Sequence, residues 1–220
     1  MDTDTIAWLV PSCANRLALQ ATQMPQNAPL NTTSPLSSQG FALRLSFSQT
    51  PSSHLGFLIG TDPACDIVLP KRPGISRRHA HLTFDADSRL VLRDTSKNWT
   101  AVWYDLQSNG DRRDFSWVLS SGFTYGFPDQ VGRIVVDIQG VRFQIVVNGP
   151  GKDVEGYVRR VDDLLLGLAD RRDALVAPLF QGTEERAFVK HTVEEEGGGP
   201  RTFLWSVARP WDPIIPVSEY

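Results

Sequence analysis

Residues Gly60–Trp103 read GTDPACDIVLPKRPGISRRHAHLTFDADSRLVLRDTSKNWTAVW, and this stretch decides the fold class of the chain. It contains three turn-forming pieces: a glycine at 60, the sequence SRRH at 76–79, and the sequence DTSKN at 94–98. Short runs of alternating apolar residues lie between these turns. Such alternation is typical of strands that bury one face. The stretch therefore predicts polar loops held by a rigid β-sheet.

The same period of two continues on both sides, from residue 41 to residue 148. Alternating apolar residues occur in FALRLSFS at 41–48, HAHLTFD at 79–85 and RLVLRD at 89–94. The run IVVDIQGVRFQIVV at 134–147 is interrupted by Gln139-Gly140, which predicts a hairpin. Short strands at this spacing predict an all-β fold of the sandwich type.

The pattern divides the chain into four parts. Residues 1–40 are predicted to hold a short strand at 5–10 and then a polar linker, because residues 23–40 are rich in Pro, Ser, Thr, Asn and Gln. Residues 41–150 form the sandwich domain. A helix occupies residues 151–176. Residues 177–220 form an irregular tail with one candidate hairpin around the sequence GGGP at 197–200.

The helix is predicted from a change of period to 3.6 residues. The apolar residues that share its face are Val154, Tyr157, Val158, Val161, Leu164, Leu165 and Leu168. The helix is expected to run from about Asp153 to Leu175 and to end before Pro178. Its apolar stripe is wide enough to require packing on the sandwich or on a partner.

Composition excludes several classes of protein. The 220 residues carry a net charge of −3, which gives no general attraction to nucleic acid or to acidic membranes. No stretch approaches the roughly 20 apolar residues of a membrane span, and the acidic start lacks the features of a secretory signal. The two cysteines form no disulfide framework, which favours a reducing compartment. We therefore expect a cytoplasmic or nuclear protein without nucleic-acid or membrane partners.

The loop at 71–78 has the chemistry of a phosphate site. Ser76 supplies a hydroxyl donor, and Arg77 and Arg78 supply planar guanidinium groups that match phosphate oxygens. Together with Lys71 and Arg72 they place four cations within eight residues of an acidic chain. A phosphorylated side chain offers several acceptor oxygens and about two negative charges. The alternative interpretation is a solvated basic loop.

Catalytic chemistry finds no support in the sequence. The chain lacks a Walker loop, a G-x-S-x-G elbow, a dinucleotide fingerprint and the motifs of a protein kinase. His79 and His81 share a strand face, but no Cys, Asp or Glu lies at zinc-binding spacing from them. No catalytic residue, metal or cofactor is predicted, and we expect no enzyme activity.

The order of the turns resembles that of forkhead-associated (FHA) domains, which are β-sandwiches that bind phosphothreonine peptides. The segments that carry the resemblance are GTDPACDIVLP, GISRRHAHLTF and LRDTSKNWTAVWY. With its flanking strands the resemblance covers residues 41–148. The layout also resembles the amino-terminal region of fungal FHA-containing protein kinases, where a tryptophan-containing strand such as RRDFSWVL follows the domain and a helix precedes the kinase.

The resemblance implies a phosphopeptide-binding site, residue by residue. Ser76 matches the phosphate-binding serine of the family. Arg77 follows it, where a polar or basic donor to the peptide or the phosphate is common. Arg78 adds a second cation, and Gly60 matches the first glycine of the pattern. The arginine that follows this glycine in the family and contacts phosphate is Thr61 here, so one strong donor is missing.

The second half of the site departs from the pattern at one position. His79 matches the family's histidine, for which a structural role in holding Ser76 is favoured over that of a catalytic base. Asn98 matches the asparagine that fixes the peptide backbone, and Lys97 precedes it. The glycine that usually follows is Trp99 here. Because glycine readily adopts φ > 0, Trp99 is expected to change the turn, its outer surface or both.

The sequence therefore predicts a non-enzymatic recognition module for phosphothreonine-containing protein segments in intracellular signalling. Two alternatives remain open. One is a degenerate FHA-like module that binds protein without phosphate or packs within its own chain. The other is the non-catalytic amino-terminal fragment of a protein kinase.

Overall fold

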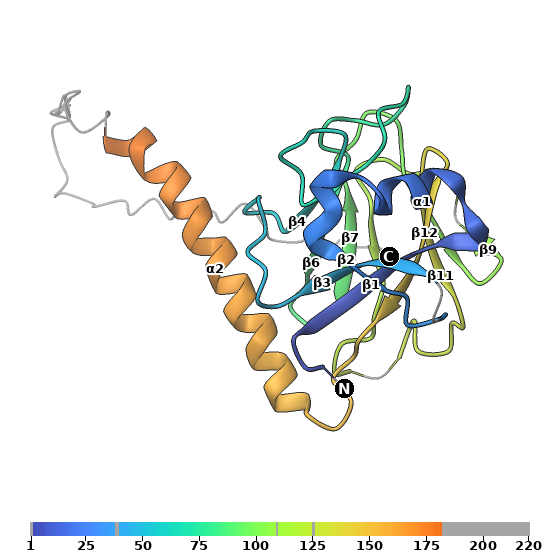
Figure 1. The fold of residues 1–220 in the computed structure, drawn as a ribbon. Coiled ribbons are helices and arrows are strands. Elements are labelled where there is room, and N and C mark those ends of the chain that lie inside the picture. The colour runs from blue at the N-terminus through green and yellow to red at the C-terminus, as the bar shows by residue number, and fades with distance from the viewer. Residues whose placement is uncertain (1, 38–39, 109, 125, 182–220) are drawn as a thin grey trace, which may run out of the picture. The chain divides into compact units, whose positions relative to one another are not determined.

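The computed structural model describes residues 2–37, 40–108, 110–124 and 126–181, with the side chains of 176–181 excepted (Figure 1). Two β-sheets and a long carboxy-terminal helix dominate these residues. The amino-terminal elements are β1 (Thr5–Pro11), η1 (Ser12–Ala14), α1 (Arg16–Thr22), η2 (Pro25–Leu30), β2 (Asn31–Thr33) and β3 (Phe41–Ser46). The later elements are β4 (Phe57–Gly60), β5 (Ile67–Val68), β6 (Ala80–Phe84), β7 (Leu90–Asp94), β8 (Ala101–Tyr104), β9 (Gln107–Ser108), β10 (Ser116–Val118), β11 (Ile134–Ile138), β12 (Val141–Val147) and α2 (Val154–Gln181).

The predicted β-sandwich is confirmed. Within the described residues, one sheet has the strand order β2-β3-β1-β12-β11-β8-β9 and the other the order β10-β7-β6-β4-β5. In the described part of the chain, all strand pairings are antiparallel except that of β4 with β5, which is parallel. Apolar side chains from both sheets meet in one core, which includes Leu43, Leu82, Leu92, Ile134 and Ile145. The alternating pattern of the sequence supplies this core because successive side chains of a strand point to opposite faces.

The predicted hairpin at residues 139–140 is also confirmed. Strands β11 and β12 pair in antiparallel register, with Ile138 opposite Val141. Gln139 and Gly140 form the turn with φ angles of 51° and 88°. Positive φ at two successive turn residues is the signature of the tight hairpin turns that match the twist of the flanking strands.

The prediction of a linker at residues 23–40 was wrong. This stretch contains η2 and β2, and β2 pairs with β3. Asn27 is fully buried: its side-chain amide donates to the carbonyl oxygens of Ala21 and Val68 and accepts from the amide of Val68. A buried polar residue satisfied in this way gives no hydrophobic period, so the composition of the segment was misleading. Strand β1 lies between β3 and β12, so the amino-terminal segment belongs to the sandwich.

Helix α2 packs on the sandwich through the predicted face. It begins after Asp153, whose carboxylate accepts a hydrogen bond from the amide of Gly156 at 3.0 Å, as an N-cap does. The Tyr157 ring meets the rings of Phe47 and Phe84 edge-on at 5.9 and 6.3 Å between centroids. Tyr157, Val161 and Leu168 are buried.

The helix continues to Gln181, so the predicted end before Pro178 was wrong. Proline removes one N–H donor, but its fixed φ of about −65° is itself helical. The predicted tail hairpin lies outside the described residues. No helix in the described part of the chain is both long enough and apolar enough to cross a lipid bilayer.

Replacing Val161 by alanine tests whether α2 is part of the folded unit. Val161 is 0% exposed, so the loss of two methyl groups and the resulting cavity should lower the free energy of unfolding by about 2 kcal/mol. Leu166→Ala is the matched control, because Leu166 is 63% exposed on the same helix and should change stability by less than about 0.5 kcal/mol. Urea unfolding of both variants measures the difference. Equal, small effects would mean that α2 does not contribute to the core.

Candidate functional site

The first part of the site forms where β4 ends. A Cβ atom on Gly60 would lie 2.1 Å from the carbonyl oxygen of Arg77, so only glycine allows the two chains to approach so closely. Immediately after it, the amide of Thr61 donates to the Ser76 carbonyl at 3.2 Å and the amide of Asp62 donates to the Arg77 carbonyl at 3.0 Å. The end of β4 therefore holds the backbone of the SRRH loop.

The buried His79 ring holds Ser76 in position. Its ring is fully buried, and its Nδ1 accepts a hydrogen bond from the amide of Ser76 at 3.0 Å. This bond assigns the ring proton to Nε2, which lies 3.3 Å from the carbonyl oxygen of Trp99. Burial lowers the pKa of His79, while the Trp99 carbonyl and Asp94 act in the opposite direction. A neutral imidazole thus ties the serine loop to the asparagine loop.

The turn that follows β7 is organised by a buried carboxylate. Asp94 is 1% exposed and accepts hydrogen bonds from the hydroxyls of Ser96 at 2.8 Å and Thr100 at 2.7 Å. It also accepts bonds from the amides of Ser96 and Asp114, both at 3.2 Å. These bonds fix both ends of the turn that carries Lys97 and Asn98.

Trp99 keeps the turn and changes its surface. Its φ angle is 61°, in the left-handed region that favours glycine. The ring is 50% exposed. Trp99 was expected to change the turn, its outer surface or both. The backbone has the positive φ that a glycine would supply at lower cost, so the tryptophan changes the surface and not the turn.

The serine loop and the asparagine loop are joined directly. The amide of Lys97 donates to the Ser76 hydroxyl oxygen at 3.2 Å, and the Asn98 side-chain amide donates to the carbonyl of Gly74 at 3.2 Å. The Ser76 hydroxyl keeps its own proton available for donation because it acts as acceptor in this bond. Asn98 is exposed.

Sequence reasoning missed two residues of this region. Gln139, in the β11–β12 turn, donates from its side-chain amide to the carbonyl oxygens of Asn98 and, at 3.0 Å, Trp99. Asp62 binds the Arg77 guanidinium, with 2.6 Å between Nη2 and the carboxylate. Gln139 is 41 residues from Asn98 in sequence, and no local signal reveals the contact. Asp62 follows Thr61 directly and could have been considered as a partner for a nearby arginine.

The assembled loops surround an open depression of about 540 Å³. Its lining residues are Asp62, Ser76, Arg77, Arg78, Thr95 and Lys97. Thr61 lies outside it and lines an adjoining depression. Of the predicted site residues, the structure thus brings Ser76, Arg77, Arg78 and Lys97 together around one depression, with Gly60 and His79 beneath the loops that form it.

The electrostatics of the depression are positive on balance. The carboxylate of Asp62 has a lowered pKa, caused first by a hydrogen bond from the Ala64 amide and then by Arg77, so it stays ionised. It offsets the charge of Arg77. Arg78 and Lys97 are exposed, and neither takes part in an ion pair in the described residues. Their cations remain available to an anionic ligand.

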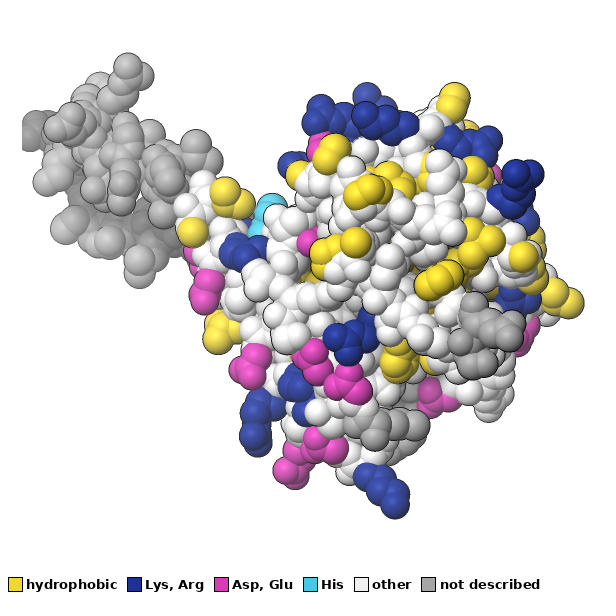
Figure 2. Space-filling view, in the orientation of Figure 1, with side chains coloured by type: hydrophobic (Ala, Val, Ile, Leu, Met, Phe, Trp, Pro, Cys, Tyr) yellow, Lys and Arg dark blue, Asp and Glu magenta, His cyan; other side chains and the backbone are white. Residues whose placement is uncertain are grey.

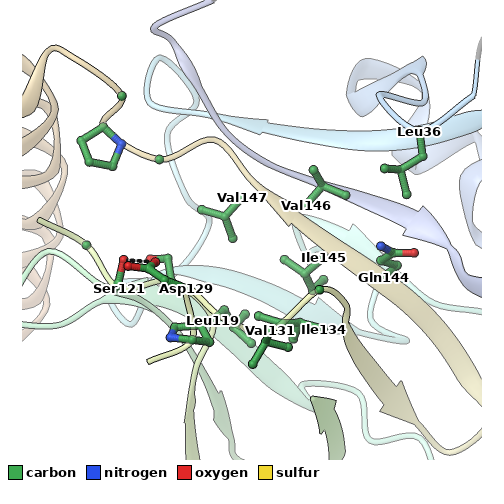
Figure 3. Close-up of a pocket in the computed structure, with 17 residues that line it drawn as sticks. Leu36, Leu119, Ser121, Asp129, Val131, Ile134, Gln144, Ile145, Val146 and Val147 are labelled. Atoms are coloured by element: carbon green, nitrogen blue, oxygen red, sulfur yellow. Dashed lines mark hydrogen bonds between the residues drawn. The ribbon is translucent and has the colours of Figure 1, made fainter. Parts of the chain in front are cut away.

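A second hollow shares no lining residue with this depression (Figure 3). Its volume is about 570 Å³, and its floor is apolar, with Leu119, Ile134 and Ile145 among its lining residues. Ser121 donates a hydrogen bond to Asp129 at its side. Residues 144–147 of β12, at the end of the strand remote from the turn at Gln139, are among its lining residues. Among the described residues, no Lys, Arg or His lines it, so these residues offer no opposite charge to phosphate.

No group of three His, Cys, Asp or Glu side chains in the described part of the chain could hold a metal ion. His81, on the outer face of β6, lies apart from the candidate site. It is 3% exposed, and its Nδ1 has no hydrogen-bond partner within the part of the chain that the structure describes. Burial, with smaller effects of Arg93 and His54, lowers the pKa of His81 to about 4.

This shift predicts a loss of stability in mild acid. The unfolded side chain takes up a proton near pH 6.5, whereas the folded one does so only near pH 4. Stability is therefore full above pH 6.5 and falls as the pH drops from 6.5 towards 4. Between about pH 7.5 and about pH 5, His81 should account for a loss of about 2 kcal/mol in the free energy of unfolding. Urea unfolding of the parent and of His81→Gln at both pH values measures it; an unchanged slope in the variant would contradict the assignment.

Comparisons with known proteins agree with this fold. Residues 57–127 match the family model of the FHA domain, and this span includes every residue predicted for the site. The match confirms the predicted FHA domain in this part of the chain. No curated protein sequence matches the chain.

Several solved structures are similar to the chain. An engineered FHA domain with a Myc-pTBD peptide is 18% identical, with a TM-score of 0.37, and the alignment covers 69% of this chain and 97% of that one. The N-terminal FHA domain of Rad53p from S. cerevisiae, in complex with a phosphothreonine peptide, is 18% identical, with a TM-score of 0.37 and coverage of 65% and 94%. A longer piece of Rad53 with AMP-PNP is 21% identical, with a TM-score of 0.38; the alignment covers 59% of this chain and 31% of that one.

Proposed function

We propose that this chain, whose residues 57–127 match the FHA domain, is a recognition module for protein segments that contain phosphothreonine. The observation that carries the proposal is the depression lined by Ser76, Arg78 and Lys97 at the loop end of the sandwich. One hydroxyl and two cations face the same open space there. A phosphate dianion needs opposite charge and directed donors together.

The support beneath these groups favours binding without rearrangement. Ser76 is held through its amide by His79 and through its hydroxyl oxygen by the Lys97 amide. Donors that are already in position lose less conformational entropy when a ligand binds. The depression is open to solvent and rimmed by loops, which suits an extended peptide better than an enclosed small molecule.

A second candidate function is protein binding without phosphate. Two observations favour it: the guanidinium of Arg77 is already paired with Asp62, and position 61 carries threonine rather than a cation. The exposed Trp99 ring beside the loops would then be a contact residue, since tryptophan is enriched at protein interfaces. The two candidates differ in whether binding depends on phosphate.

A phosphopeptide-library pull-down, compared with the same library after phosphatase treatment, tests the proposal. Enrichment of phosphothreonine peptides that disappears after dephosphorylation is the expected result. Peptides captured equally from both libraries would support binding without phosphate. Capture of phosphoserine and phosphothreonine peptides in equal amounts would mean that the module recognises the phosphate group and not the threonine methyl group.

The threonine at position 61 leads to a prediction about affinity. Thr61→Arg adds a guanidinium in the depression that adjoins the site, and one charge-assisted hydrogen bond from it to phosphate contributes about 1.5–3 kcal/mol when well formed. The variant should therefore bind a phosphothreonine peptide about 10- to 100-fold more tightly than the parent. Titration of one peptide pool against the parent, Thr61→Arg, and Thr61→Arg with Trp99→Gly measures the gain.

The third variant separates charge from access. If only the variant with Trp99→Gly binds more tightly, the Trp99 ring restricts the groove. If neither variant gains affinity, position 61 does not face the phosphate in this chain.

We also propose that the chain acts in the cytoplasm or nucleus as an adaptor or as the non-catalytic part of a longer kinase. FHA domains are non-catalytic binding modules, so we expect no catalytic activity from residues 57–127. Saturable binding of ATP with magnesium by the purified chain would contradict it, because neither depression has the parts that hold a nucleotide in kinases.

A further inference from the structure

Two basic depressions adjoin at the loop end of the sandwich. The first is the depression around Ser76 described above. The second, of about 600 Å³, is lined by Thr61, Asp62, Pro63, Lys71, Arg72, Pro73 and Arg77. Asp62 and Arg77 line both, so their ion pair is the wall between the two spaces. Figure 2 shows Lys and Arg side chains gathered along this edge of the molecule, above the strands.

The cations of the second depression are not neutralised within the described residues. Lys71 and Arg72 are exposed, and no ion pair involves either of them there. Asp62, the one acid in the lining, is already paired with Arg77. Each depression therefore presents two unpaired cations, Arg78 and Lys97 in the first and Lys71 and Arg72 in the second.

A single phosphate cannot use both sets of cations. It carries about two charges, which Arg78 and Lys97 can balance on their own. The wall of Asp62 and Arg77 separates it from Lys71 and Arg72. The carboxylate in the wall also repels an anion that lies between the two spaces. The arrangement thus fits two anionic groups, one on each side.

The short side chain at position 61 leaves the second depression open. Thr61 is 8% exposed and lines the depression with a short side chain. A longer side chain there would extend into the space between Lys71 and Arg77. Threonine leaves this space to a ligand.

We propose that the ligand is a peptide with two anionic groups: a phosphothreonine in the depression at Ser76, and a second phosphate or a carboxylate in the depression at Lys71 and Arg72. This inference rests on the proposed function and specifies its ligand class. Two exposed cations together contribute about 1.4 kcal/mol to the second contact at low salt, which corresponds to a tenfold change in affinity. The second anion should therefore tighten binding by about tenfold.

Calorimetric titration of a peptide series tests the inference. The series has a phosphothreonine alone, and the same peptide with one added glutamate or one added phosphoserine at each neighbouring position in turn. The full chain is titrated as parent, as Lys71→Ala/Arg72→Ala, and as the control Lys152→Ala/Arg159→Ala, which removes two exposed cations of the helix region. The measured quantity is the ratio of the two affinities, doubly to singly charged peptide.

The expected ratio is about ten in the parent and in the control at the best position, and near one in Lys71→Ala/Arg72→Ala. It should also decrease at high salt, because exposed charges are screened. The glutamate and phosphoserine arms distinguish a carboxylate from a second phosphate. A ratio near one at every position in the parent, with the singly phosphorylated peptide bound, would overturn this inference alone. An unchanged ratio in Lys71→Ala/Arg72→Ala would also overturn it. No binding of any phosphopeptide would overturn the proposed function itself.

Discussion

Replacing Asp94 by alanine is expected to lower the free energy of unfolding by about 4 kcal/mol. Four donors share this carboxylate: the hydroxyls of Ser96 and Thr100 and the amides of Ser96 and Asp114. Asp94 is 1% exposed, so water cannot replace it for the donors that remain buried. Each unsatisfied donor costs about 1 kcal/mol.

Urea unfolding of Asp94→Ala, Asp94→Asn and Asp87→Ala tests this prediction. Asparagine keeps one carbonyl oxygen as an acceptor and should recover part of the loss. Asp87 is half exposed, with a side-chain exposure of 51%, and its removal should matter by less than about 1 kcal/mol. If Asp94→Ala is no more destabilising than Asp87→Ala, the network around Asp94 does not hold the turn.

The second large effect is expected at Gly60. In Gly60→Ala the new Cβ would lie 2.1 Å from the Arg77 carbonyl oxygen and 3.1 Å from the Arg78 Cα, both backbone atoms that cannot rotate away. Strand β4 and the serine loop must therefore separate, which also weakens the hydrogen bonds from Thr61 and Asp62. We expect a loss of about 3 kcal/mol in stability, with weaker phosphopeptide binding than the lost stability alone would cause.

Gly149→Ala is the matched control, because a Cβ at this position would have no described residue within 4 Å apart from its own chain neighbours. Thermal unfolding of the two variants should differ by about 6–12 °C, given about 2–4 °C for each kcal/mol in a chain of this size. Equal melting temperatures would contradict the close approach at Gly60.

The strands were predictable from the sequence because their signal is local. Alternating apolar residues produced the sandwich, and the Gln139-Gly140 break produced the hairpin between β11 and β12. The segment at 23–40 was mispredicted because Asn27 is buried through bonds to Ala21 and Val68, and Val68 lies 41 residues away. The helix end was mispredicted because the fixed φ of proline is itself helical, so the missing N–H donor of Pro178 does not end α2.

The site was predictable only where its signal is local in sequence. The two turns that carry Ser76 and Asn98 were visible as turn chemistry, and their order carried the resemblance to FHA domains. The links between them were not visible, since the Gln139 amide and the His79 ring join loops that are distant in sequence. The pairing of Arg77 with Asp62 depends on how β4 and the serine loop meet, which no local pattern encodes.

At position 99 the FHA pattern, which has glycine there, indicates the backbone conformation better than the conformational preference of tryptophan does. A tryptophan at φ 61° is unfavourable by itself, yet the turn keeps this conformation. Asp94, Thr100 and the bonds to the Trp99 carbonyl from His79 and Gln139 fix the backbone on both sides. The surrounding contacts therefore determine the turn, and the side chain at 99 determines only what it presents to solvent.

Calorimetric titration with one phosphothreonine peptide and with the same peptide unphosphorylated, repeated with Ser76→Ala, tests directly whether the chain recognises phosphothreonine through Ser76. We expect saturable binding of the phosphorylated peptide only, weakened about tenfold by Ser76→Ala through the loss of one hydrogen bond to a charged group. Equal binding of both peptides, or phosphate-dependent binding that Ser76→Ala leaves unchanged, would contradict it.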